Sequence, residues 1–197
     1  MRAALIWGAL AAALLIPLWI AATSPLLEWR EPVYIIAGLA GVIGLALMTL
    51  QPLLAAGLLP GLPAPKGRRV HLWIGLAILA AVLIHVGGLW ITSPPDVIDA
   101  LTFASPTPFA IWGVLAMWAV FASAALAGLR RRLHLSPRIW RRAHTALALV
   151  IVAGTAAHAM LIQGTMGTVS KTALCIAALG LTLKVIHDLR IWSRRRA

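Results

Sequence analysis

Four histidines are the residues of this 197-residue sequence with the clearest capacity for chemistry. His71 and His85 lie in one apolar stretch, and His144 and His158 lie in another. In each stretch the two histidines are 14 residues apart. On a helix, which turns by about 100° per residue, this interval returns a side chain to within about 40° of its first direction and about 21 Å further along the axis. Each stretch therefore predicts a helix with two imidazoles on one face at two depths.

Two such helices side by side would form two facing imidazole pairs, and a pair of imidazoles is an axial ligand set of b-type haem. Zinc fits less well, because each depth offers two histidines and no cysteine or carboxylate to complete a set of four. A purely structural role suits any single histidine but leaves the repeated interval unexplained. His134 and His187 have no matching partner, which favours solvated or interfacial positions. A haem also needs space beside its ligands, and small residues lie about one helical turn from each histidine: Gly75, Gly88, Ala148 and Gly154.

The composition indicates what surrounds these histidines. Hydrophobic residues make up 61% of the chain and charged residues 11%, with a mean hydropathy of +0.94. A soluble domain carries about a quarter charged residues, so the predicted partner of this surface is the lipid bilayer. The net charge of +12 does not indicate nucleic acid, because the basic residues cluster at the ends of apolar stretches, as orientation signals do. Cys175 is the single cysteine, so there is no disulfide framework and no CxxCH motif for covalent haem attachment.

Six apolar stretches are long enough to cross a bilayer. The first has a cleaved signal peptide as its alternative interpretation, but its length favours a retained helix. The proline-rich segment 92–108 is too polar to span and leaves room for a short interfacial helix. The prediction is an all-α membrane protein, a bundle of six transmembrane helices with haem sites between the third and the fifth. The expected spans are about 3–22, 33–59, 70–91, 109–129, 143–162 and 172–189.

Basic residues mark one side of this bundle. Of the 17 lysines and arginines, 14 fall in the N-terminus, the segments 59–70 and 129–142, and the tail 190–197. The positive-inside rule makes this side cytoplasmic and places both termini there.

The topology also fixes how the histidines pair. The third and fifth helices run in the same direction, so His71 pairs with His144 near the cytoplasm and His85 pairs with His158 near the outside. Four arginines flank the cytoplasmic pair and either bind haem propionates or serve only as topology signals: Arg68, Arg69, Arg141 and Arg142.

The segments GRRVHLWIGLAILAAVLIHV and WRRAHTALALVIVAGTAAHAM, in this order and with this paired interval, resemble the ferric reductase-like transmembrane domain. That family includes ferric-chelate reductases, NADPH oxidases and the haem-binding membrane subunit of the bacterial periplasmic methionine sulfoxide reductase system. The resemblance covers about residues 33–165. It implies a multi-pass protein of the bacterial inner membrane that carries electrons between two b-type haems. By the same resemblance, the haem ligands are His71, His85, His144 and His158.

The sequence departs from the larger family members in one respect. Ferric reductases and NADPH oxidases continue into soluble flavin and nicotinamide domains, whereas this sequence ends at RRRA and has no dinucleotide motif. We therefore expect no catalytic residues of its own, and a donor that is a cytoplasmic flavoprotein or a membrane quinol. The acceptor would be a ferric chelate or a partner reductase at the periplasmic face. Two other functions stay open: a haem-binding sensor or assembly protein, and a small transporter whose histidines relay protons.

Overall fold

The structure is a computed structural model that describes residues 1–189, and within this part it is entirely helical. Six of its helices are long and apolar enough to cross a membrane, which confirms the predicted six-span bundle. The basic tail counted above, 190–197, lies outside the described residues. In chain order the elements are α1 Arg2–Ala22, the short 3-10 helix η1 Pro25–Leu27, α2 Pro32–Ala56, α3 Ala64–Thr92, α4 Pro94–Leu101, α5 Ala110–Leu129, α6 Pro137–Leu161 and α7 Thr168–Asp188.

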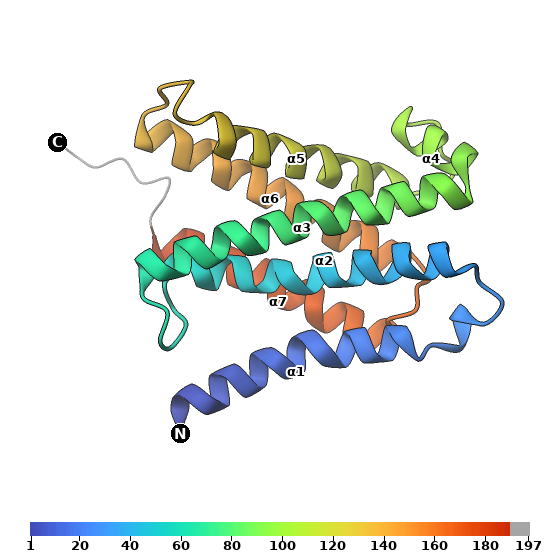
Figure 1. Ribbon diagram of the computed structural model, residues 1–197, viewed down its shortest axis with the longest axis horizontal. Coiled ribbons are helices and arrows are strands. Elements are labelled where there is room, and N and C mark those ends of the chain that lie inside the picture. Colours follow the sequence, from blue (N-terminus) through green and yellow to red (C-terminus); the bar gives the residue numbers. More distant parts are fainter. Residues whose placement is uncertain (190–197) are drawn as a thin grey trace.

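The helices form two antiparallel hairpins with a third layer behind them. α3 packs along α2, and α6 packs along α5, while α7 joins the two hairpins by contacting both α2 and α6 (Figure 1). α1 lies at the outside of the bundle, against α2 and α7. In the described residues, α3 and α6 have almost no close backbone contact, so the two histidine helices face each other at a distance.

Small side chains allow the close packing of the central layer. The buried core joins residues of α2, α6 and α7, and it includes Ala46, Ala156, Ala159 and Cys175. Small residues at such positions let the backbones of membrane helices approach each other. α3 stays outside this core: 11% of the residues in its apolar window are buried, against 44% for α2. The histidines of α3 are therefore positioned mainly by packing against α2 and not by the buried core.

The two histidine helices begin earlier than their apolar stretches. α3 starts at Ala64 and α6 at Pro137, in segments that hydropathy alone assigned to loops. The start of α6 is set by local chemistry, since Ser136 Oγ accepts a hydrogen bond from the amide of Ile139 at 3.3 Å and proline occupies the first turn. Serine caps and first-turn prolines are favourable at helix N-termini. The flanking arginines thus lie within the first turns of the histidine helices.

The turn between α2 and α3 fixes how these helices lie on each other. Gly57 ends α2 in the left-handed conformation (φ 68°), where a Cβ would lie 2.7 Å from the backbone nitrogen of Ala64. Gly67 then presses its backbone against α2, since a Cβ there would lie 2.5 Å from the carbonyl oxygen of Leu54. Both positions need glycine for close backbone approach.

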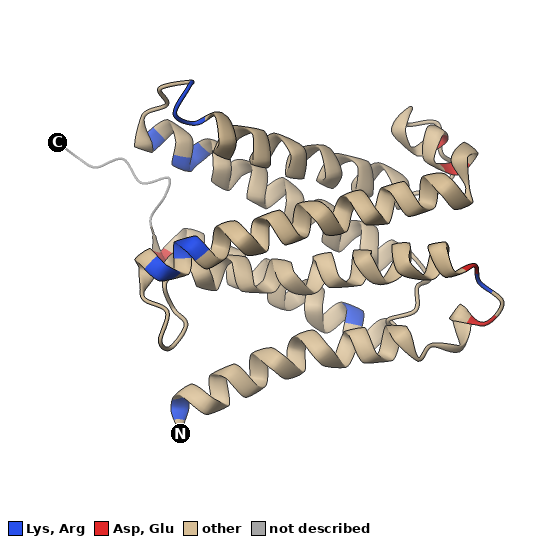
Figure 2. Cartoon of the chain, in the orientation of Figure 1, with Lys and Arg blue, Asp and Glu red and all other residues tan. Residues whose placement is uncertain are grey.

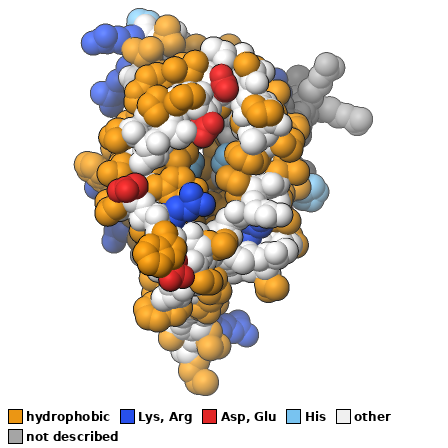
Figure 3. Space-filling view, turned by 90° about the vertical axis from the view of Figure 1, so that its right-hand side faces the viewer, with side chains coloured by type: hydrophobic (Ala, Val, Ile, Leu, Met, Phe, Trp, Pro, Cys, Tyr) orange, Lys and Arg blue, Asp and Glu red, His pale blue; other side chains and the backbone are white. Residues whose placement is uncertain are grey.

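The two ends of the bundle carry opposite charge patterns. We call the end with the N-terminus and the segments 57–63 and 130–136 the basic end, and the end with 23–31 and α4 the acidic end. Lysines and arginines gather at the basic end, whereas all aspartates and glutamates except Asp188 lie at the acidic end (Figure 2). Figure 3 looks onto the acidic end and shows red carboxylates among apolar side chains, with pale blue histidine visible in a recess between them. This distribution agrees with the expected gathering of basic residues on one side of the bundle (Figure 2).

Candidate functional site

The structure brings the four histidines together as two pairs. The ring centroids of His71 and His144 are 6.0 Å apart at the basic end, with 69° between the ring planes. Those of His85 and His158 are 6.4 Å apart toward the acidic end, with 81° between the planes. All four side chains are partly buried. α3 supplies one member of each pair and α6 supplies the other.

The Nδ1 atom of each histidine forms a hydrogen bond with the preceding part of its helical hairpin. Three of the rings use a backbone carbonyl oxygen of the neighbouring helix: His71 that of Gln51 (3.1 Å), His85 that of Ala37 (2.7 Å) and His158 that of Phe109 (2.9 Å). A carbonyl oxygen only accepts, so these Nδ1 atoms must donate. In a neutral imidazole this leaves Nε2 with its lone pair free to bind a metal.

His144 differs from the other three because its Nδ1 partner is a hydroxyl. Ser123 Oγ on α5 lies 3.0 Å from Nδ1, and a hydroxyl can either accept or donate. The remaining contact of this ring is with Trp140, one turn earlier on α6, whose ring plane is nearly parallel (7°) at a centroid distance of 5.1 Å.

The partners of the histidines repeat the histidine interval on the preceding helices. Ala37 and Gln51 are 14 residues apart on α2, and Phe109, the residue before α5, is 14 residues from Ser123 on that helix. In an antiparallel hairpin, equal intervals keep both histidines of one helix opposite both partners of the other. None of these four residues has a side-chain type that indicates a role in the site. The repeated interval is the signal that could have found them.

Two glycines make room for the histidines nearer the acidic end. A Cβ at Gly41 would lie 3.0 Å from Nδ1 of His85, and a Cβ at Gly113 would lie 2.7 Å from Nδ1 of His158. Each glycine stands four residues after the carbonyl that its histidine uses, so the missing side chain leaves that carbonyl uncovered. Gly41 and Gly113 are therefore part of the site, although neither belongs to a histidine helix.

Two of the small residues predicted to leave space for haem, Gly88 and Gly154, instead pack against neighbouring helices. A Cβ at Gly88 would lie 2.7 Å from the Cβ of Ala37, and one at Gly154 would lie 3.0 Å from the carbonyl oxygen of Trp112. These glycines bring each histidine helix close to its hairpin partner. The expectation that they leave space beside the ligands was wrong for Gly88 and Gly154, because sequence position does not reveal which neighbour a residue faces.

The geometry of the pairs fits a haem held by two imidazoles. A ligating imidazole nitrogen lies about 2.0–2.1 Å from its metal, and the ring centre lies about 1.1 Å behind that nitrogen. Two imidazoles on opposite sides of one iron would thus have centroids about 6 Å apart, close to the observed 6.0 and 6.4 Å. The Nδ1 hydrogen bonds supply the orienting contact that ligating histidines have as a rule. By contrast, the described residues contain no group of three or more side chains suited to hold a lone metal ion.

The four predicted propionate arginines lie at the basic end, but they are not equivalent. Arg68, Arg69 and Arg141 are exposed. Arg142 is partly buried, and its Nε has no hydrogen-bond partner within the described chain. A second unpartnered buried donor at this end is Nε1 of Trp140.

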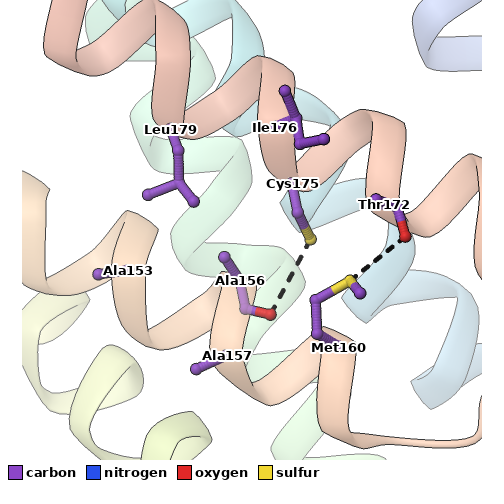
Figure 4. A pocket seen from close by; sticks show the side chains of 8 residues that line it. All are labelled: Ala153, Ala156, Ala157, Met160, Thr172, Cys175, Ile176 and Leu179. Atoms are coloured by element: carbon purple, nitrogen blue, oxygen red, sulfur yellow. Dashed lines mark hydrogen bonds between the residues drawn. The ribbon is translucent and has the colours of Figure 1, made fainter.

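The other candidate groups lie apart from the pairs. His134 and His187 are exposed, as expected from their lack of partners. Cys175 lines an open apolar groove of about 390 Å³ between α6 and α7, where its Sγ lies 4.0 Å from the carbonyl oxygen of Ala156 (Figure 4). The hydroxyl of Thr172 in the same groove donates to Sδ of Met160 at 3.7 Å. The polar side chains of this groove are engaged in helix packing.

Lys171 is a further residue whose role was missed from the sequence. It is buried at the start of α7, and its Nζ donates to the carbonyl oxygen of Ile162 at 2.7 Å, just after the end of α6. A lysine at this place satisfies carbonyls that a helix end leaves free. This hydrogen bond stabilises the end of α6 that carries His158.

A comparison with known protein families gives one match. The family model described as ferric reductase like transmembrane component matches residues 40–155. The matched segment contains His71, His85 and His144 and ends shortly before His158. No curated protein matches the chain, and no solved structure matches it.

Proposed function

The chain belongs to the ferric reductase-like transmembrane family, and from this premise we propose that it is a haem b electron-transfer protein of the membrane. In this proposal it binds two haems, one at each histidine pair, and passes electrons from one side of the bilayer to the other. The membrane-embedded, six-span architecture supports such a role. A cytoplasmic flavoprotein or a quinol would serve as donor, and a ferric chelate or a partner reductase as acceptor.

One observation carries the proposal. Two imidazole pairs, each with the separation that a single iron requires, lie at two depths of the same bundle. Because the members of each pair are 14 residues along their helices from the members of the other, the two irons would be about 21 Å apart, less any helix tilt. A single pair would bind a haem but would give no path across the membrane.

In this function the polypeptide would bind the haems, orient their histidine ligands and exclude water from the sites. His71 with His144, and His85 with His158, would hold the two haems, and the haem would supply reversible one-electron chemistry. The acceptors of the Nδ1 protons fix the tautomer and the direction of each ring. The apolar helices around the pairs exclude water, and Arg142 offers an unpartnered donor to a propionate at the basic end.

The first test is the absorption spectrum of the purified full-length protein. We expect a reduced-minus-oxidised difference spectrum of low-spin b-type haem and a stoichiometry of two haems per chain, measured as the pyridine haemochrome. A protein that folds into a helical, detergent-stable form but binds no haem after supply of haemin would contradict the proposal. In that case the histidines would have to serve proton relay or structure.

Orientation in the membrane is tested by labelling. The basic end is proposed to be cytoplasmic and the acidic end periplasmic. In a Cys175→Ala background, a cysteine at Ala104, which is exposed at the acidic end, is expected to react with a membrane-impermeant maleimide on intact spheroplasts. A cysteine at Leu133, which is exposed in the 130–136 segment at the basic end, is expected to react only after the membrane is permeabilised. The reverse pattern would invert the proposed direction of electron flow.

A further inference from the structure

The two histidine pairs differ in how strongly their Nδ1 atoms are held. Toward the acidic end both rings donate to backbone carbonyls at short distances, 2.7 Å for His85 and 2.9 Å for His158. At the basic end Nδ1 of His71 lies 3.1 Å from the carbonyl oxygen of Gln51 and 2.6 Å from the side-chain amide of the same residue, whereas His144 has only the Ser123 hydroxyl at 3.0 Å. A histidine that donates its second N–H to a good acceptor becomes a more basic ligand. His144, whose Nδ1 has a hydroxyl in place of a carbonyl, is therefore the weakest electron donor of the four imidazoles to a bound iron.

A second contact also lowers the electron-donating strength of the His144 imidazole. Its ring stacks on Trp140 at 5.1 Å, and the guanidinium of Arg130 lies 4.4 Å from the centre of the Trp140 ring on which His144 also stacks. The cation draws on the electrons of the indole face, and the indole is in turn the neighbour of the imidazole. Arg130, Trp140 and His144 thus form one continuous contact from the 130–136 segment to the basic-end pair.

The charges at the two ends of the bundle also favour a higher reduction potential at the basic-end site. Arginines gather at the end of the bundle that holds the basic-end pair, whereas carboxylates outnumber basic residues at the acidic end (Figure 2). A positive environment favours the reduced form of an iron site, because reduction lowers the positive charge there by one.

We propose that the basic-end site has the higher reduction potential of the two, and that Ser123, Trp140 and Arg130 are positioning residues that set this difference through His144. This inference rests on the proposed function, since it requires haem at both pairs. A chain with both sites oxidised that receives one electron would hold it at the basic end. Electrons that cross in the proposed direction, from the basic end to the acidic end, would therefore move one at a time toward the site of lower potential, with no proton or bond change at either pair.

The test is a redox titration of the full-length protein with spectroscopic detection. His85→Ala is expected to retain only the basic-end haem, and His71→Ala only the acidic-end haem, so each potential can be assigned. We expect the His85→Ala protein to have the higher midpoint. We also expect Arg130→Gln to lower the ratio of reduced to oxidised basic-end haem at fixed ambient potential by about twofold to fivefold, the equivalent of an exposed cation–π contact. A tenfold change would correspond to about 59 mV for a one-electron couple.

The matched control is Arg132→Gln, which removes the same charge from the same exposed segment without touching Trp140. It is expected to change the ratio by less than half as much. In a Trp140→Leu background, Arg130→Gln is expected to have no more effect than Arg132→Gln. An equal shift from both arginines, or a lower midpoint at the basic end, would overturn the inference while two bound haems would leave the proposed function standing. A protein without haem would overturn both.

Discussion

Replacing His85 by alanine is expected to remove one of two haems and to leave the other in place. The iron at this pair would lose one of its two axial ligands, and the remaining imidazole, His158, stays tied to Phe109 at 2.9 Å. The other pair is a full 14-residue interval away and shares no hydrogen-bond partner with this one. We therefore expect the haem content to fall from two to one per chain, measured as pyridine haemochrome, with the remaining haem still low-spin.

The partner substitution and an unrelated histidine provide the controls. His158→Ala is expected to give the same single loss, and the double substitution no further loss, because both residues serve one site. His134→Ala is expected to keep both haems, since His134 is exposed in the 130–136 segment and lies in neither pair. If His85→Ala lost both haems, or neither, the assignment of the two pairs to two separate haems would be wrong.

Adding a single methyl group at Gly113 is expected to be nearly as damaging to haem binding as removing a histidine. In Gly113→Ala the new Cβ would lie 2.7 Å from Nδ1 and 2.9 Å from Cε1 of His158, closer than atoms in proteins pack. The ring must then turn away and give up its bond to Phe109. Disturbing the groups that orient a metal-bound histidine lowers metal affinity by about 10–100-fold. We expect this loss at the acidic-end haem alone, measured by haemin titration of the apoprotein.

Gly128→Ala on the same helix is the matched control, because a Cβ there meets nothing within 4 Å. Glycine to alanine within a helix favours the helix by about 1 kcal/mol, so neither variant should unfold for reasons of propensity. On α2 the corresponding pair is Gly41→Ala, with a Cβ 3.0 Å from His85, and Gly38→Ala, with open space. Equal haem affinity in Gly113→Ala and Gly128→Ala would show that the His158 ring has more freedom than its surroundings suggest.

Much of the architecture could be predicted because its determinants lie within single segments. Apolar length predicts the spans, and the interval of 14 between histidines predicts which residues share a helix face. The parallel course of α3 and α6 follows because a single crossing, α5, lies between them. The early starts of these helices were missed, since Ser136 and Pro137 act through capping and not through hydropathy.

The supporting parts of the site could not be predicted in the same way. The hydrogen-bond partners at Ala37 and Phe109 are backbone carbonyls, which every residue type provides, so the side chain at these two positions carries no signal. The importance of Gly113 depends on contact with another helix, which no local pattern reveals. The role of Trp140 is hidden in the same way, because its stacking on His144 and its contact with Arg130 depend on side-chain direction.

If the chain has the proposed function, the separation of the two pairs would also make electron transfer sensitive to the membrane voltage. In the proposed orientation an electron moving between the pairs travels about 21 Å through a hydrocarbon core about 30 Å thick. One elementary charge crossing the whole membrane at 100 mV changes its energy by about 2.3 kcal/mol, so this step would account for about two thirds of that. Since the cytoplasmic side of an energised cell is negative, the field would drive electrons outward and offset a lower potential at the acidic end. The protein would thus be electrogenic, with each electron that it delivers partly discharging the membrane.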